Sequence, residues 1–150
     1  SACEKGGQWE KALELLDKMQ ASGIEPDVIT YSAAISACEK GGQWEKALEL
    51  LNKMQASGIE PDVITYNATI SACEKGGQWE KALELLNKMQ ASGIEPDVIT
   101  YSATISACEK GGQWEKALEL LNEMQASGIE SDVITYSATI SACEKGGQWE

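Results

Sequence analysis

The 150-residue chain has no histidine and no arginine, so its only basic side chains are twelve lysines. It therefore lacks the side chain most often used as a general acid or base near neutral pH, and the planar cation that grips phosphate through two hydrogen bonds. A glycine-rich phosphate-binding loop between a strand and a helix is also missing. From these absences we expect no catalytic activity and no bound cofactor.

Long apolar runs are absent as well. No stretch reaches the ~18 apolar residues of a membrane span, and no basic and apolar leader precedes the repeated pattern described below. We expect no membrane insertion by this segment. The sequence remains compatible with a targeting peptide upstream of it.

Positive charge is scarce, because 24 Asp and Glu residues outnumber the lysines and give a net charge of −12. Bulk electrostatic attraction alone does not hold such a chain on nucleic acid. A local row of lysines still acts over the Debye length of about 8 Å at physiological salt. The net charge therefore does not decide the question of a nucleic-acid partner.

Five cysteines recur 35 residues apart, at Cys3, Cys38, Cys73, Cys108 and Cys143. Stacked helices lie about 8–10 Å apart, whereas a disulfide needs Cα atoms about 4.4–6.8 Å apart. We expect these cysteines to be reduced and to serve as small buried apolar residues. Without histidine or closely spaced cysteine pairs, no metal site is expected.

Internal repetition is what the chain has in abundance. The decapeptide that starts at Ser1 returns at Ser36, Ser71, Ser106 and Ser141, and nearly everything between the copies returns too. A fixed period of this length is typical of a solenoid, in which one small supersecondary unit stacks on copies of itself. The apolar core then runs along the stack, and no repeat is expected to be stable alone.

The first half of each repeat has the pattern of a helix. In the copy from Val63 to Asp97, Asp62 can act as N-cap, and Tyr66, Ile70 and Cys73 share one face. The β-branched residues weaken this helix locally, so neighbouring repeats must stabilise it. The paired glycines at 76 and 77 end it.

A second helix is predicted to begin near Gln78. Its apolar side carries Trp79, Ala82, Leu83, Leu86 and Met89. Gly93, in the left-handed conformation, and Pro96 end it. Each repeat is thus predicted to form two antiparallel helices, and the fold to be all-α.

The repeat resembles the pentatricopeptide repeat. The matching residues are Val63-Ile64-Thr65-Tyr66-Asn67, Ile70, Cys73, Lys75-Gly76, Glu80 to Leu85, Met89 and Gly93 to Asp97. The 34-residue tetratricopeptide pattern fits worse, because its Trp-Leu-Gly-Tyr first helix is absent. The resemblance implies a right-handed α-solenoid of stacked antiparallel helix pairs. Residues 1–150 then form one array, with full repeats at 28–62, 63–97 and 98–132 and partial repeats at 1–27 and 133–150. This array is expected to be a fragment of a longer protein.

Only a few positions differ between copies. Asp17 replaces Asn, Ala34 replaces Thr, Glu123 replaces Lys and Ser131 replaces Pro. Ser131 is expected to loosen its loop without extending the helix, because Gly128 still stops it. The remaining difference is Asn67, where the other copies have serine.

The resemblance implies a function. Members of the family typically bind single-stranded RNA in chloroplasts or mitochondria, one base per repeat, with the protein's N-terminus toward the 5′ end. The implied base-selecting pairs are Ser32 with Asp62, Asn67 with Asp97, and Ser102 with Asp132, while Ser137 has no partner within the sequence. Ile29, Ile64, Ile99 and Ile134 would sandwich the bases. Amide and hydroxyl groups of this kind can select the edge of an unstacked base.

The family's preferences imply G for Ser with Asp and U for Asn with Asp, and hence a 5′-GUG-3′ core. Lys40, Lys75 and Lys110 match a position that contacts phosphate in the family, and are expected to form a local cationic row.

These residues also have structural interpretations that the sequence leaves open. The aspartates are good N-caps without RNA, and serine or asparagine is tolerated on a helix surface. The isoleucines can pack between repeats, and the lysines can neutralise the carbonyl end of the first helix.

A second function also fits the sequence: a protein-binding scaffold, or a structural subunit of a large organellar complex. The acidity and the near-identity of the repeats favour it. A reader of varied RNA is expected to diversify its selecting positions, and here only Asn67 departs from the others.

Overall fold

The computed structural model describes residues 8–146. This part of the chain forms eight helices, α1 (Trp9–Ala21), α2 (Val28–Lys40), α3 (Trp44–Ala56), α4 (Val63–Lys75), α5 (Trp79–Ala91), α6 (Val98–Lys110), α7 (Trp114–Ala126) and α8 (Val133–Lys145), and no strand. The predicted all-α class is confirmed. Cys3, together with the rest of residues 1–7 and residues 147–150, lies outside the described residues.

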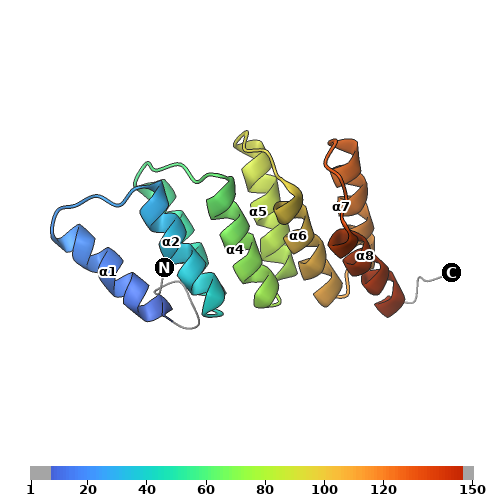
Figure 1. Cartoon of the computed structure of the whole chain (residues 1–150), viewed down its shortest axis with the longest axis horizontal. Coiled ribbons are helices and arrows are strands. Elements are labelled where there is room, and N and C mark those ends of the chain that lie inside the picture. The colour runs from blue at the N-terminus through green and yellow to red at the C-terminus, as the bar shows by residue number, and fades with distance from the viewer. Residues whose placement is uncertain (1–7, 147–150) are drawn as a thin grey trace.

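The helices follow one another along the long axis of the molecule in chain order (Figure 1). The first helices of successive repeats, α2, α4, α6 and α8, contact one another in a continuous row. The second helices α3, α5 and α7 each contact the first helix of their own repeat and that of the next. The predicted solenoid of helix pairs is therefore confirmed.

The local signals in the sequence set the helix boundaries. Asp62 caps α4 by accepting a hydrogen bond from the backbone N–H of Thr65, and Asp27, Asp97 and Asp132 do the same in their repeats. Gly77 and Gly93 adopt φ angles of +71° and +80°, which favour glycine. After Gly93, the N–H of Ile94 donates to the carbonyl of Met89 at 3.0 Å, which closes the end of α5.

Most of the residues that the periodicity selects are in the core, but Trp79 and Leu83 are only partly buried, and Leu85, which it did not select, is buried. Tyr66 and Ile70 of α4 are fully buried, as are their counterparts in α2 and α6. In α8 the equivalent Tyr136 and Ile140 are 44% and 67% exposed, because no described helix lies beyond α8 to cover them. Burying a large apolar side chain contributes about 1.5–3 kcal/mol. Much of each repeat's stability therefore comes from the repeat that follows it.

Tryptophan and glycine join successive repeats. Trp44, at the start of α3, lies against Gly76, at the end of α4, and a Cβ built on Gly76 would lie 2.3 Å from Trp44 Cδ1. The same contact recurs between Trp9 and Gly41, Trp79 and Gly111, and Trp114 and Gly146. Gly76 has φ −86°, which any residue adopts. Glycine is needed there because the indole leaves no room for a side chain.

Two of the differences between copies, Glu123 and Ser131, are explained locally. Glu123 accepts hydrogen bonds from the hydroxyl of Tyr101 at 2.9 Å and from the amide of Gln90 at 3.0 Å. Burial, followed by this contact with Glu123, raises the pKa of Tyr101 to about 12. As expected for Ser131, α7 still ends at Ala126, and Gly128 keeps a φ of +81°.

The described cysteines are free. Cys38, Cys73 and Cys108 are buried, and burial raises the pKa of each thiol to about 11. Cys143, in α8, is only half-buried. The prediction that the cysteines are small buried residues is confirmed for Cys38, Cys73 and Cys108.

Burial should make the thiols react unequally. At pH 8 we expect alkylation of Cys143 to be at least about tenfold faster than that of Cys73, because the thiolate is the reactive form and must be accessible. Peptide mapping after timed alkylation measures both rates in one sample, and urea-unfolded protein, where the rates should converge, is the control. Equal rates in the folded protein would contradict the burial of Cys73.

Of the helices described, none combines the length and the apolar character needed to cross a membrane.

Candidate functional site

The predicted sandwiching isoleucines are exposed. Ile29, Ile64, Ile99 and Ile134 occupy the second position of α2, α4, α6 and α8, with exposed fractions of 74%, 62%, 56% and 59%. More than half of each of these side chains is exposed, so the isoleucines are not buried between repeats. Each repeat therefore exposes one isoleucine at the second position of its first helix.

One complete set of predicted residues meets in a pocket between α6 and α8. Ile99 and Ile134 line it together with Ser102 and Asp132, the predicted selecting pair of that repeat. Its other lining residues are Ser71, Val98, Ala103 and Ser106, and its volume is about 290 Å³. Two apolar side chains and a polar pair thus line one open hollow.

The predicted pair Asn67 and Asp97 is in direct contact. The side-chain N–H of Asn67 donates to Asp97 Oδ1 at 3.1 Å, and the amide oxygen accepts from the hydroxyl of Thr100. Asn67 is only 8% exposed. The only asparagine among the selecting positions is therefore held in place before any ligand arrives.

The pair Ser32 and Asp62 is joined through a threonine. The hydroxyl of Thr65 lies 2.8 Å from that of Ser32 and donates to Asp62 at 2.7 Å. In the repeat that begins at Val133, Thr135 instead donates to the main-chain oxygen of Asp132 at 2.8 Å. Ser137, on α8, is exposed. Capping is thus one role of the aspartates, and their carboxylates also lie beside the selecting residues.

Hydrogen bonds lower the pKa of two of the capping aspartates. The pKa of Asp27 is lowered chiefly by the backbone N–H of Thr30. Burial by itself would raise the pKa of Asp97, but hydrogen bonds from Thr100 and Asn67 outweigh it and lower the pKa. Asp97 is therefore a hydrogen-bond acceptor, and not a donor, at neutral pH.

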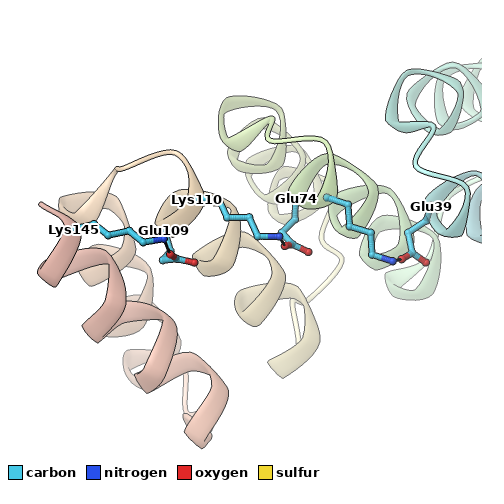
Figure 2. A network of polar contacts seen from close by, with 6 residues as sticks. Glu39, Glu74, Glu109, Lys110 and Lys145 are labelled. Carbon is cyan, nitrogen blue, oxygen red and sulfur yellow. Dashed lines mark hydrogen bonds and ion pairs between the residues drawn. The ribbon is translucent and has the colours of Figure 1, made fainter.

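The predicted lysines lie at the other end of the first helices, and Lys75 and Lys110 are paired with glutamates. Lys75 bonds to Glu39 and Lys110 to Glu74, and Lys145 bonds to Glu109 in the same way (Figure 2). Each pair joins neighbouring repeats. Lys40 is exposed at the end of α2. The expected cationic row therefore has carboxylates interleaved with it at Lys75 and Lys110.

Sequence reasoning missed the threonines and these glutamates. The threonines and the glutamates recur in every copy, but so do the core residues. Periodicity alone therefore does not distinguish residues that make contacts at the site from residues of the core. The signal that could have found the ion pairs is an opposite charge one residue beyond the period, as in Glu39 and Lys75. Within residues 8–146, no group of three or more Cys, Asp or Glu side chains is placed to hold a metal ion.

The stacked helix pairs define an α-helical repeat solenoid. Family models agree in sequence: the PPR repeat family matches residues 61–110 and 103–145, the pentatricopeptide repeat domain residues 14–78, and the PPR repeat residues 1–24. The chain belongs to the pentatricopeptide repeat family.

Solved structures show the same architecture. The pentatricopeptide repeat protein PPR10 from maize is 33% identical, with a TM-score of 0.73 over 95% of this chain and 20% of that chain. PPR10 in complex with an 18-nt psaJ RNA element gives 27% identity and a TM-score of 0.79 over 97% of this chain and 22% of that chain. This chain thus spans about a fifth of PPR10.

A more distant structure supports the fold alone. The PPR domain of Arabidopsis thaliana protein-only RNase P 1, in complex with tRNA, is 18% identical, with a TM-score of 0.84 over 99% of this chain and 81% of that chain. No curated protein sequence matches this chain significantly.

Proposed function

We propose that this chain binds single-stranded RNA, one base per repeat, and does not itself catalyse a reaction. The observation that carries this proposal is the pocket in which Ile99, Ser102, Asp132 and Ile134 meet. An unstacked base needs two apolar faces and a polar group at its edge, and these four residues supply both. The likeness to PPR10, whose structure contains an RNA element, supports the same reading.

The contacts suggest how a base is chosen. Ile99 and Ile134 flank the base, while the polar pair faces its edge. Ser with Asp selects G and Asn with Asp selects U, which gives 5′-GUG-3′ for the three full repeats. Because Asn67 and Asp97 are already bonded, the U-selecting repeat enters the complex preorganised, which reduces the ordering cost of binding.

Charge contributes less than in a basic RNA-binding protein. Lys75 and Lys110 are about half exposed, but each already has a carboxylate partner. A phosphate must therefore compete with Glu39 or Glu74. We expect a shallow salt dependence, with about one counterion released per lysine engaged.

Fluorescence anisotropy tests the proposal. Single strands that carry GUG within an adenosine tract are compared with a scrambled strand and with a duplex, over a series of salt concentrations. We expect about tenfold or greater preference for the GUG strand, since each base-specific contact is worth about 1–3 kcal/mol. Equal affinity for GUG and scrambled strands, or no binding, would reject sequence-selective binding.

Lys110→Gln is a useful variant within the same assay. It should weaken all strands about equally and reduce the slope against salt by about one, because a phosphate contact carries no base information. The RNA should remain intact after prolonged incubation. Strand cleavage by the purified chain would contradict the non-catalytic assignment.

We further propose that the parent protein acts in RNA metabolism of a chloroplast or mitochondrion, on the strength of the family. A fluorescent fusion of the full-length protein tests this. Signal outside both organelles would reject it.

A second candidate is a scaffold that binds protein, favoured by the net charge of −12 and by the exposed isoleucine row. The two candidates differ in one measurable respect. A scaffold would show no preference for GUG strands. The exposed isoleucines Ile29, Ile64, Ile99 and Ile134 would still be needed, because they would bind the protein partner.

A further inference from the structure

Thr100 lies at the junction between two repeats. It is fully buried, and its hydroxyl donates to Asn67 Oδ1 from the preceding repeat. The same hydroxyl lies 3.0 Å from Asp97 Oδ1 and accepts the backbone N–H of Asp97 at 3.0 Å. With the bond between Asn67 and Asp97, these contacts close a triangle among the three side chains.

The triangle fixes which way the amide of Asn67 faces. Asp97 is ionised and only accepts, so the amide N–H₂ must face it, and the amide oxygen faces the hydroxyl of Thr100. After a half-turn of the amide, its oxygen would oppose the carboxylate. That arrangement is unfavourable because two acceptors would meet without a hydrogen between them.

The orientation of an amide matters for pyrimidines. Uracil presents the N3–H donor beside a carbonyl acceptor, whereas cytosine presents the N3 acceptor beside an amino donor. An asparagine amide carries both a donor and an acceptor, so a freely rotating amide can match either base by turning over. An amide held in one orientation matches only one of them.

We propose that Thr100 is a positioning residue that holds the Asn67 amide in one orientation and thereby sets the preference of this repeat for uracil over cytosine. This inference rests on the proposed RNA binding. Thr100 contacts no base itself. It acts through Asn67 and Asp97, whose polar groups it joins.

The neighbouring junction supplies a matched control. Thr135 occupies the same helix position as Thr100, is also fully buried, and forms the same capping box with its aspartate. The hydroxyl of Thr135 donates to the main-chain oxygen of Asp132. The repeat before Thr135 carries Ser102 at the position that Asn67 occupies in the repeat before Thr100. Thr135→Val therefore removes a buried capping hydroxyl without touching an asparagine amide.

The experiment measures the ratio of affinities for GUG and GCG strands. We expect the wild-type chain to prefer GUG, and Thr100→Val to lower the ratio by about fivefold, which corresponds to one hydrogen bond of ordinary strength. Thr100→Ser, which keeps the hydroxyl, and the control Thr135→Val should leave the ratio within about twofold of wild type. Thr100→Ala serves as a second variant without the hydroxyl, and helicity by circular dichroism identifies folded samples.

The outcomes separate this inference from the function on which it rests. If wild type binds GUG no better than scrambled RNA, the proposed function fails. If wild type prefers GUG and both Thr100→Val and Thr100→Ala keep the same ratio, RNA binding stands and the role of Thr100 is overturned. An equal fall in Thr135→Val would also overturn it, because the effect would then come from the cap.

Discussion

Replacing Gly76 with alanine is expected to destabilise the array by about 2 kcal/mol. The new methyl carbon would lie 2.3 Å from Trp44 Cδ1, well inside any contact distance, so the indole or the end of α4 must move. Overpacking of this kind costs about 1–3 kcal/mol. Urea unfolding followed by circular dichroism measures the change in the free energy of unfolding.

Two further variants show whether steric conflict is the cause. Gly77→Ala has no atom within 4 Å of the new Cβ but requires a φ of +71°, so it tests the backbone cost at the adjacent position. In a Trp44→Ala background, Gly76→Ala should become nearly neutral, because φ −86° suits alanine. An undiminished cost in that background would show that the tryptophan contact is not the reason for glycine.

Asn67→Ser is expected to change the central base of the preferred RNA from U to G. The substitution makes repeat 63–97 carry the same selecting residues as its neighbours, and it removes the amide that bonds to Asp97. The ratio of affinities for GUG and GGG strands should shift by about 10–100-fold toward GGG, as expected for a contact worth about 1–3 kcal/mol. Anisotropy titrations of both strands measure it.

The reciprocal variant Ser102→Asn provides the control. It introduces the amide into the next repeat, beside Asp132, and should shift preference from GUG to GUU. If Asn67→Ser weakens every strand equally, Asn67 contributes to stability and not to base choice.

Local signals were sufficient to predict the helices. The aspartate caps, the paired glycines and the glycine near position 93 act within a few residues, so their effects can be derived from one repeat. The predicted start of the second helix near Gln78 agrees with α5, which begins at Trp79 with Gln78 as its N-cap. For the same reason the apolar periodicity selected most of the core residues, although it missed the buried Leu85.

Contacts between repeats could not be predicted from the signals within one repeat. The ion pair of Lys75 with Glu39, the contact of Trp44 with Gly76 and the hydrogen bond from Thr100 to Asn67 each join residues more than 30 positions apart. Their existence depends on the displacement between neighbouring helix pairs, which no single repeat specifies. The sequence therefore indicated the candidate selecting residues but not how they are held.

The arrangement of helix contacts has a consequence for the length of the array. Every described helix contacts helices of its own repeat or of the adjacent one only. Inserting another 35-residue copy, such as residues 63–97, would therefore recreate existing junctions on both sides and require no new type of contact. Under the proposed reading of one base per repeat, a chain extended in this way would bind a strand longer by one nucleotide, so duplication of a single module would be enough to change the target.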